Sequence, residues 1–277
     1  MPYSFESLPF VAEGKTKILR RSGPRLVDIF EKNNMTAGNG KRHELIPGKG
    51  KICAAVSATL FGLLTRQRIP NCFVEAVVPG INRAEEGIMA PFEVVERRVA
   101  DGSYCKRNPG VRSGTRLHVP IVEYYLKTRD RNFHGIALPD DDPLVMRVGE
   151  DGLDVVHPAL IESSAEQAAS LVHIPSDVIY GASGMYPFQF MTDMTHAVGE
   201  VLEEHWANVG TTLIDFKIEF ARKADGTLGV ADSLSPDEMR LLTNEGRMPC
   251  KEPFRKGAAV DEMVELYTEA LIRCKQM

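Results

Sequence analysis

The feature that most constrains the fold is a run of alternating apolar and charged residues from Ile214 to Phe220, IDFKIEF. Successive side chains of a β-strand point to opposite faces, so the alternation predicts a strand whose Ile and Phe side chains face a core. The opposite face carries Asp215, Lys217 and Glu219. On the pattern alone, the simplest interpretation is that this charged face meets solvent.

The Asp225-Gly226 pair that follows the run predicts a β-hairpin, because both residues tolerate the positive φ of a type I′ turn. A two-residue loop there places Glu219 directly opposite Asp232. Opposed carboxylates, with Cβ atoms roughly 5 Å apart, repel each other unless a cation lies between them. Mg²⁺ beside a nucleotide is commonly held by one or two carboxylates. The hairpin is therefore either structural, with a register that separates the two carboxylates, or a metal site.

Composition limits the classes of protein that fit. A chain of 277 residues with 43% hydrophobic content can bury a large core, as one domain or as two joined lobes. The net charge of -5 argues against a nucleic-acid-binding protein, which usually carries a basic excess. Local basic clusters still allow a small anionic substrate.

The five cysteines are scattered and odd in number, which predicts neither a disulfide framework nor a zinc site and fits a reducing, cytosolic compartment. The longest nearly apolar run, residues 52–64, is shorter than the ~18 residues that cross a bilayer. The N-terminus has no basic segment leading into an apolar one, as a signal peptide would. We therefore expect a cytoplasmic protein with no membrane partner.

The order of the expected elements predicts an α+β fold, with strands gathered early and helices later. Strands are expected over 8–30 and 90–99, and helices over 51–66, 187–208 and the C-terminal segment from Val260. We expect an N-terminal β-rich lobe over residues 1–88 and a larger α+β lobe over 89–277.

The segment EGKTK, from Glu13 to Lys17, is not a Walker A motif, because Pro9 stands where the motif needs its first glycine. It predicts a strand that turns at Gly14 and carries Lys15 and Lys17 on one face. These lysines are either a solvated edge or a pair of cations over nucleotide phosphates.

A dense basic stretch follows the strand expected at 90–99. Around Gly102-Ser103 it gathers Arg97, Arg98, Lys106, Arg107 and Arg112. Guanidiniums, a hydroxyl and exposed backbone N–H groups are what a phosphomonoester needs. We expect an anion-binding site here rather than an ordinary solvated loop.

Several segments occur in an order that resembles the phosphoribosylaminoimidazole-succinocarboxamide synthases, or SAICAR synthetases. They are EGKTK, TAGN, GKG, PFEVVERRVADGSYCKRNPG, LIDFKIEF and ADSLSPDEMR. The combination of TAGN and KRNPGV is most similar to animal-type members, although we expect no fused carboxylase domain. Residues 129–186 match the family poorly.

The resemblance implies a small antiparallel lobe and a larger α+β lobe with ATP bound between them, as in kinases. It implies an ATP-dependent amide ligase that joins L-aspartate to the carboxylate of carboxyaminoimidazole ribonucleotide through an acyl phosphate in purine biosynthesis. The implied cofactors are ATP and Mg²⁺, and the partners are small molecules. The sequence leaves the oligomeric state open and allows a homo-oligomer.

The resemblance also implies roles for individual residues. It assigns catalysis to Asp215, Lys217 and Arg240. It assigns nucleotide binding to Gly14, Lys15, Lys17, Glu219 and Asp232, and the metal to Glu219 and Asp232. It assigns substrate binding to Arg97, Ser103, Lys106, Arg240 and Arg255.

Some positions depart from the family pattern, notably Ala54, Ala55, Asp101, Ala221 and Ser233. These changes permit a related substrate. Two alternatives therefore stay open: a divergent amide ligase acting on another azole carboxylate or another amine in specialised metabolism, and a catalytically silent homologue that binds nucleotide. The retained lysines and carboxylates disfavour the silent homologue, because a scaffold does not need opposed carboxylates.

Overall fold

The structure is a computed structural model of the chain. It describes residues 3–38, 41–128, 133, 135–136, 138, 142–156, 171–180 and 186–276. The poorly matching segment 129–186 therefore lies partly outside the described residues, and so does Asn39 of the TAGN segment.

The chain divides into two compact units, described separately below. One consists of Met1–Met89 and Ala197–Met277, and the other is Ala90–His196. Residues 197–277 therefore group with the N-terminal part of the chain. How nucleotide and substrate binding are shared between the expected lobes 1–88 and 89–277 stays a prediction.

The first unit contains an antiparallel five-stranded sheet in the order β1-β2-β3-β7-β6. Its strands are β1 (Phe10–Glu13), β2 (Lys17–Gly23), β3 (Leu26–Glu31), β6 (Phe73–Val78) and β7 (Ile81–Glu85). A separate hairpin pairs β4 (Asn34–Ala37) with β5 (Arg42–Leu45). The expected turns at Gly14 and Gly23 fall at the two ends of β2.

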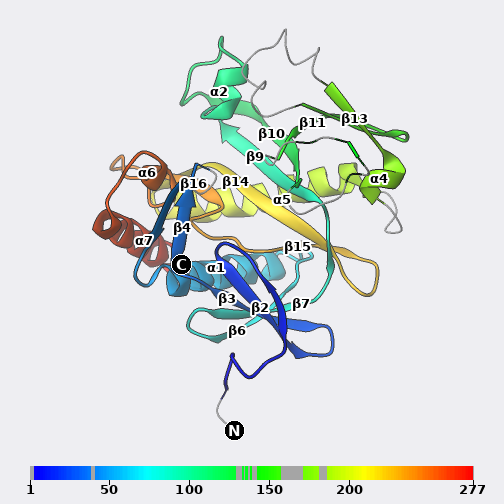
Figure 1. The fold of residues 1–277 in the computed structure, drawn as a ribbon. Helices are drawn as coiled ribbons and strands as arrows, with labels where there is room; N and C mark the ends of the chain where they lie inside the picture. The colour runs from blue at the N-terminus through cyan, green and yellow to red at the C-terminus, as the bar shows by residue number, and fades with distance from the viewer. Residues whose placement is uncertain are drawn as a thin grey trace. The chain divides into compact units, whose positions relative to one another are not determined.

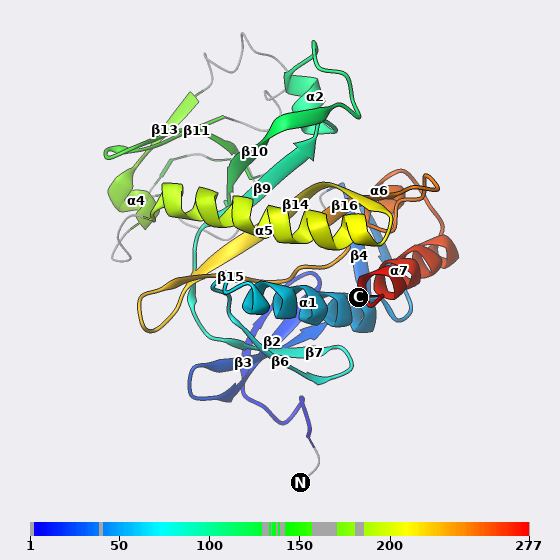
Figure 2. The same ribbon diagram turned by 180° about the vertical axis from the view of Figure 1, so that it is seen from behind.

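Helix α1 (Lys49–Arg66) packs against β3, β6 and β7, as Figures 1 and 2 show. Its buried face carries Val56, Leu60 and Leu64 at helical spacing, which explains why this stretch of the sequence folds as a helix on a sheet. The helix begins beside β3 because Gly50 has no side chain: a Cβ there would lie 2.1 Å from the backbone oxygen of Glu31. The helix expected over 51–66 thus starts two residues earlier.

The C-terminal part of this unit is built on strand β14 (Thr211–Arg222). Within this unit, β14 pairs in antiparallel fashion with β8 (Ile88–Met89), β15 (Leu228–Ala231) and β16 (Met239–Thr243). The short helix α6 (Glu252–Arg255) and the helix α7 (Val260–Cys274) follow, and α7 packs against α1. The apolar set of β14 is core as predicted, since Phe216, Ile218 and Phe220 are at most 1% exposed.

The second unit contains an antiparallel sheet in the order β13-β12-β11-β10-β9. Its strands are β9 (Phe92–Val99), β10 (Arg116–Leu126), β11 (Leu144–Gly149), β12 (Gly152–Val156) and β13 (Leu171–Pro175), and its short helices are α2 (Ser103–Arg107) and α4 (Ser176–Tyr180). Phe92, Tyr124 and Phe188 pack edge to face in its core.

Helix α5 (Phe188–Asn208) contains the boundary between the two units, and its expected apolar face is buried at Met191, Met194, Val198 and Leu202. The antiparallel sheets and the long helices together confirm the predicted α+β class. Among the described residues, no helix is both long and apolar enough to cross a membrane.

The predicted register of the β14–β15 hairpin is wrong by one residue. Glu219 pairs with Ala231 instead of Asp232, because the loop has three residues, Ala224 to Gly226, rather than two. Gly226 donates its N–H to the Lys223 carbonyl at 2.9 Å and has φ +86°, the left-handed residue that completes a type I turn with a bulge. The Asp-Gly signal located the turn correctly but did not fix its length.

Candidate functional site

The charged face of β14 is not solvated, so the simplest interpretation of the sequence pattern is wrong. Asp215 is 6% exposed and Glu219 is 4% exposed. The side chain of Lys217 is also largely buried. Burying ionised groups is costly unless they are paired, so this face of the strand forms a compact polar cluster.

Asp232 joins this cluster despite the shifted register. It follows the end of β15 with φ +67°, a left-handed conformation that Asp tolerates better than most residues. The Lys217 Nζ lies 3.1 Å from Glu219 Oε1 and 3.6 Å from Asp232 Oδ2. The two carboxylates therefore converge on one cation, although they are not cross-strand partners.

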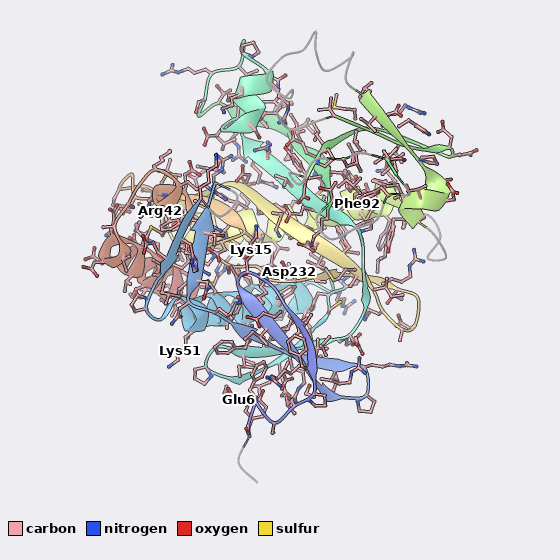
Figure 3. All side chains as sticks on the ribbon, in the orientation of Figure 1. Glu6, Lys15, Arg42, Lys51, Phe92 and Asp232 are labelled. Atoms are coloured by element: carbon pink, nitrogen blue, oxygen red, sulfur yellow. The ribbon has the colours of Figure 1, made fainter. Side chains whose placement is uncertain are left out.

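Lys17 approaches the same carboxylate from β2. Its Nζ donates to Asp232 Oδ1 at 2.5 Å and to Ser233 Oγ at 2.7 Å. The hydroxyl of Ser233, the residue after Asp232, thus accepts a hydrogen bond from the lysine. Figure 3 shows Asp232 and also Lys15, which lies in the turn before β2.

The charges around Lys17 set the protonation of the cluster. Burial disfavours the charged form of Lys17, but the carboxylates of Asp232 and Glu31 outweigh it and hold the pKa of this lysine above its usual value. Burial acts in the opposite direction on Glu31 and raises its pKa to about 7, despite the Lys17 ammonium 4.0 Å away. Lys17 is therefore protonated at neutral pH, and it faces two carboxyl groups, those of Asp232 and Glu31.

Gly14 and Lys15 differ from Lys17 in their surroundings. Both are exposed, and Lys15 is outside the strand rather than on a shared strand face. A Cβ built at Gly14 would have no heavy atom within 4 Å, so packing within the chain does not require a glycine there. The space beside Gly14 is open, so a ligand has room to lie close to the backbone of this turn.

Asp215 and Arg240 form a buried ion pair that follows from the pairing of β14 with β16. The two residues are cross-strand partners. Arg240 Nε lies 2.9 Å from Asp215 Oδ1 and 3.1 Å from Oδ2, and its Nη2 also donates to this carboxylate. Such a fork holds the guanidinium in one orientation. Both residues come from segments that the sequence singled out, but their direct pairing was not predicted.

The loop that follows Asp232 is anchored by α1 and α7, through residues that sequence reasoning missed. Ser57 Oγ accepts a hydrogen bond from the backbone N–H of Leu234 at 3.1 Å. Lys49 Nζ lies 2.5 Å from Asp237 Oδ2, and Tyr267 donates to Asp237 Oδ1 at 2.6 Å. Burial opposes ionisation of Asp237, but the Lys49 ammonium lowers the pKa of this carboxyl below its usual value. In the sequence, Lys49 lies in the GKG segment and Asp237 lies in the SPD part of ADSLSPDEMR, and neither residue was given a role.

In the second unit, the predicted anion-binding residues Arg97 and Ser103 are in contact. Arg97 Nη2 donates to Ser103 Oγ at 3.1 Å, and Arg97 Nε lies 2.7 Å from Glu123 Oε2. The turn between β9 and α2 requires Gly102, whose φ of +57° with ψ -132° is a conformation that other residues avoid. Glu123 was missed, because nothing in the β10 sequence marks it as different from other strand residues.

Other members of the basic stretch lie elsewhere. Arg98 donates to the buried Glu96 rather than joining Arg97, because neighbouring residues of β9 face opposite sides. Lys106 and Arg112 are exposed. Arg255 in α6 is also largely exposed and pairs with Glu252 at 3.1 Å. The basic stretch is thus not one cluster, and Arg97 with Ser103, and Arg107, which donates to Glu123, are built into the fold.

The described residues contain no group of three or more His, Cys, Asp or Glu side chains placed to hold a metal ion by themselves. Glu219 and Asp232 are two convergent carboxylates. This number of protein ligands is typical of Mg²⁺ that is shared with phosphates, and it is too few for a site made only of protein groups.

The chain is similar in sequence and in fold to known enzymes. The family model "SAICAR synthetase" matches residues 10–140 and 172–269. A phosphoribosylaminoimidazole-succinocarboxamide synthase from Herpetosiphon aurantiacus is 34% identical over 258 residues, which cover 91% of this chain and 89% of that protein. The similarity thus runs along almost the whole of both chains.

Solved structures give the same result. A type-2 SAICAR synthetase in complex with ADP superposes with a TM-score of 0.73 and 26% identity, covering 96% of this chain and 97% of that one. A crystal structure (Type-1) of SAICAR synthetase from Pyrococcus horikoshii has a TM-score of 0.72 and 25% identity, covering 94% of this chain and 98% of that one. The closer similarity to animal-type members stays a prediction. The chain belongs to the SAICAR synthetase family, ATP-dependent ligases of purine biosynthesis.

Proposed function

We propose that the protein joins L-aspartate to carboxyaminoimidazole ribonucleotide at the expense of ATP, through an acyl phosphate. The observation that carries the proposal is the convergence of Lys17 and Lys217 on Asp232 and Glu219. Alternating cations and carboxylates are suited to holding a metal-bound triphosphate. The ADP complex of a related SAICAR synthetase supports nucleotide binding by this chain.

The residues present fit a magnesium ion. Glu219 and Asp232 supply hard oxygen ligands, and the Lys217 ammonium that both carboxylates contact marks where a cation is stabilised. When bound, Mg²⁺ would neutralise charge on the nucleotide phosphates. Lys17 and Lys15 would bind phosphate oxygens, and Gly14 would let the nucleotide approach the backbone. Lys217 would hold the substrate carboxylate toward the phosphoryl group.

The chemistry requires two successive substitutions. A carboxylate oxygen of the imidazole substrate attacks the γ-phosphorus of ATP, and ADP leaves. The aspartate amine then attacks the acyl carbon, the phosphate group departs with the oxygen that it received, and the amine loses a proton. Such phosphoryl transfer depends mainly on positioning and on charge neutralisation. The ion pair of Asp215 and Arg240 would serve positioning, because each side chain holds the other in one orientation.

The phosphate of the nucleotide substrate would bind to Arg97 and Ser103, which are already in contact. A guanidinium and a hydroxyl complement a phosphomonoester. Lys106 of the same unit, and Arg240 and Arg255 of the first unit, are the other residues that we propose for substrate binding. The five free cysteines agree with a cytoplasmic location, and assembly into a homo-oligomer stays a prediction.

Substrate specificity can be tested by measuring phosphate release from ATP with the imidazole ribonucleotide and a panel of amino acids. We expect release to require both the ribonucleotide and L-aspartate and to match product formation mole for mole. Turnover with a different amine or azole carboxylate would instead identify a divergent ligase. Intact nucleotide binding without turnover for any pair would identify a silent homologue and would contradict the proposal.

A further inference from the structure

We propose that Arg107 is a further anion-binding residue of the second unit, and that Glu123 is the positioning residue that holds the guanidiniums of Arg107 and Arg97 together. The identity of the anion, the phosphomonoester of the ribonucleotide, rests on the proposed function. The arrangement of the side chains does not.

The guanidinium of Arg107 is buried and only partly used. Its side chain is 7% exposed. Nη2 donates to Glu123 Oε1, whereas Nη1 is buried and makes no hydrogen bond with any residue in the described ranges of the chain. A buried donor without an acceptor is costly, and this cost is removed when a ligand supplies the acceptor. Arg107 Nη1 is therefore available to donate a hydrogen bond to a bound anion.

Glu123 fixes two guanidiniums with its two carboxylate oxygens. Oε2 accepts from Arg97 Nε at 2.7 Å and from the Tyr125 hydroxyl at 3.0 Å, while Oε1 accepts from Arg107. The carboxylate itself is 8% exposed, so it is part of the interior of the unit. One buried negative charge is thus shared by two positive ones, and it sets the direction in which both forks point.

The position of Arg107 on α2 brings it to the anion site. Ser103 and Arg107 are four residues apart, which places them on one face of a helix. Ser103 is exposed and accepts a hydrogen bond from Arg97, so its hydroxyl marks the side of the cluster that a ligand reaches. Arg97, Ser103 and Arg107 together provide two guanidiniums and a hydroxyl for one phosphate group.

Binding of ribose 5-phosphate and of inorganic phosphate, measured calorimetrically, tests the role of Arg107 without the ligase reaction. Arg107→Ala is expected to weaken ribose 5-phosphate binding about tenfold or more, as is usual for a lost charge-assisted hydrogen bond. Arg107→Lys keeps the charge but loses the fork and is expected to bind with intermediate affinity. Arg147→Ala serves as control, because Arg147 is an exposed arginine of the same unit that pairs with Asp154.

Unchanged affinity in folded Arg107→Ala would overturn the assignment. Should that variant fail to unfold cooperatively on heating, Arg107→Lys decides, and wild-type affinity there would overturn it equally. The result is independent of the ligase test: loss of phosphate binding without aspartate-dependent turnover would leave the anion site standing and refute the proposed function.

Glu123→Gln separates positioning from simple electrostatics. Removing a negative charge beside two guanidiniums would by itself tighten the binding of any anion. If Glu123 positions the guanidiniums, binding of ribose 5-phosphate weakens instead. The amide N–H₂ group of Gln cannot accept a hydrogen bond, so one of the two arginines loses its acceptor and is no longer held in place. Weaker binding by the variant, measured at a temperature well below its thermal midpoint so that it is folded, supports positioning. Tighter or equal binding contradicts it.

Discussion

Asp232→Asn and Glu219→Gln are each expected to lower turnover at limiting Mg²⁺ by roughly 10²-fold or more, because a lost metal ligand removes several kcal/mol of charge stabilisation. Each substitution keeps the size of the side chain and removes one of the two charges that converge on Lys217. Asp232→Asn also removes the charge that faces Lys17 at 2.5 Å.

The measurement is turnover as a function of Mg²⁺ concentration, combined with calorimetric ADP binding with and without Mg²⁺. The variants should lose the Mg²⁺-dependent gain in ADP affinity. Glu86→Gln is the matched control, since Glu86 is a surface carboxylate of the same unit paired with Arg21. Near-normal activity of both site variants at limiting Mg²⁺ would show that these carboxylates do not hold the metal.

Asp237→Asn is expected to destabilise the fold by about 3–5 kcal/mol, because it leaves the ammonium of Lys49 buried without its counter-charge. The Lys49 side chain is 0% exposed, and its Nζ lies 2.5 Å from Asp237. The amide still accepts from Tyr267, so the change acts mainly on the charge. Lys49 opens α1 and Asp237 lies in the loop after Asp232, so the pair fastens this loop to the helix.

Urea unfolding at pH 7 measures this cost. The exposed Arg21–Glu86 pair provides the comparison, and Glu86→Gln should cost less than about 1 kcal/mol. A similar small effect for Asp237→Asn would mean that the buried pair contributes no more to stability than a surface pair.

The fold was largely predictable because its main signals are local. The 2-residue period of IDFKIEF identified β14 and its core face, and helical spacing identified α5 and α7. These predictions hold because burial of one face decides the conformation of each segment. The boundaries of α1 were less well predicted, since its first turn depends on the contact between Gly50 and the Glu31 carbonyl, which joins segments distant in sequence.

The candidate site was predicted in its members but not in its geometry. Register failed at the hairpin because a two-residue and a three-residue loop both accommodate Asp225-Gly226, and only the structure shows which forms. The convergence of Asp232 on Lys217 then arises from a left-handed residue that no period predicts. Glu123, Lys49 and Asp237 escaped notice because their partners come from other elements of the fold.

In the proposed reaction the substrate carboxylate is activated as an acyl phosphate. The direct test is to place ¹⁸O in the carboxylate of the imidazole ribonucleotide and to analyse the inorganic phosphate released during amide formation by mass spectrometry. A carboxylate at neutral pH does not expel an oxygen unless that oxygen is converted to a leaving group. We expect one labelled oxygen in each phosphate released. Phosphate free of label, formed together with the amide, would show that no acyl phosphate is formed.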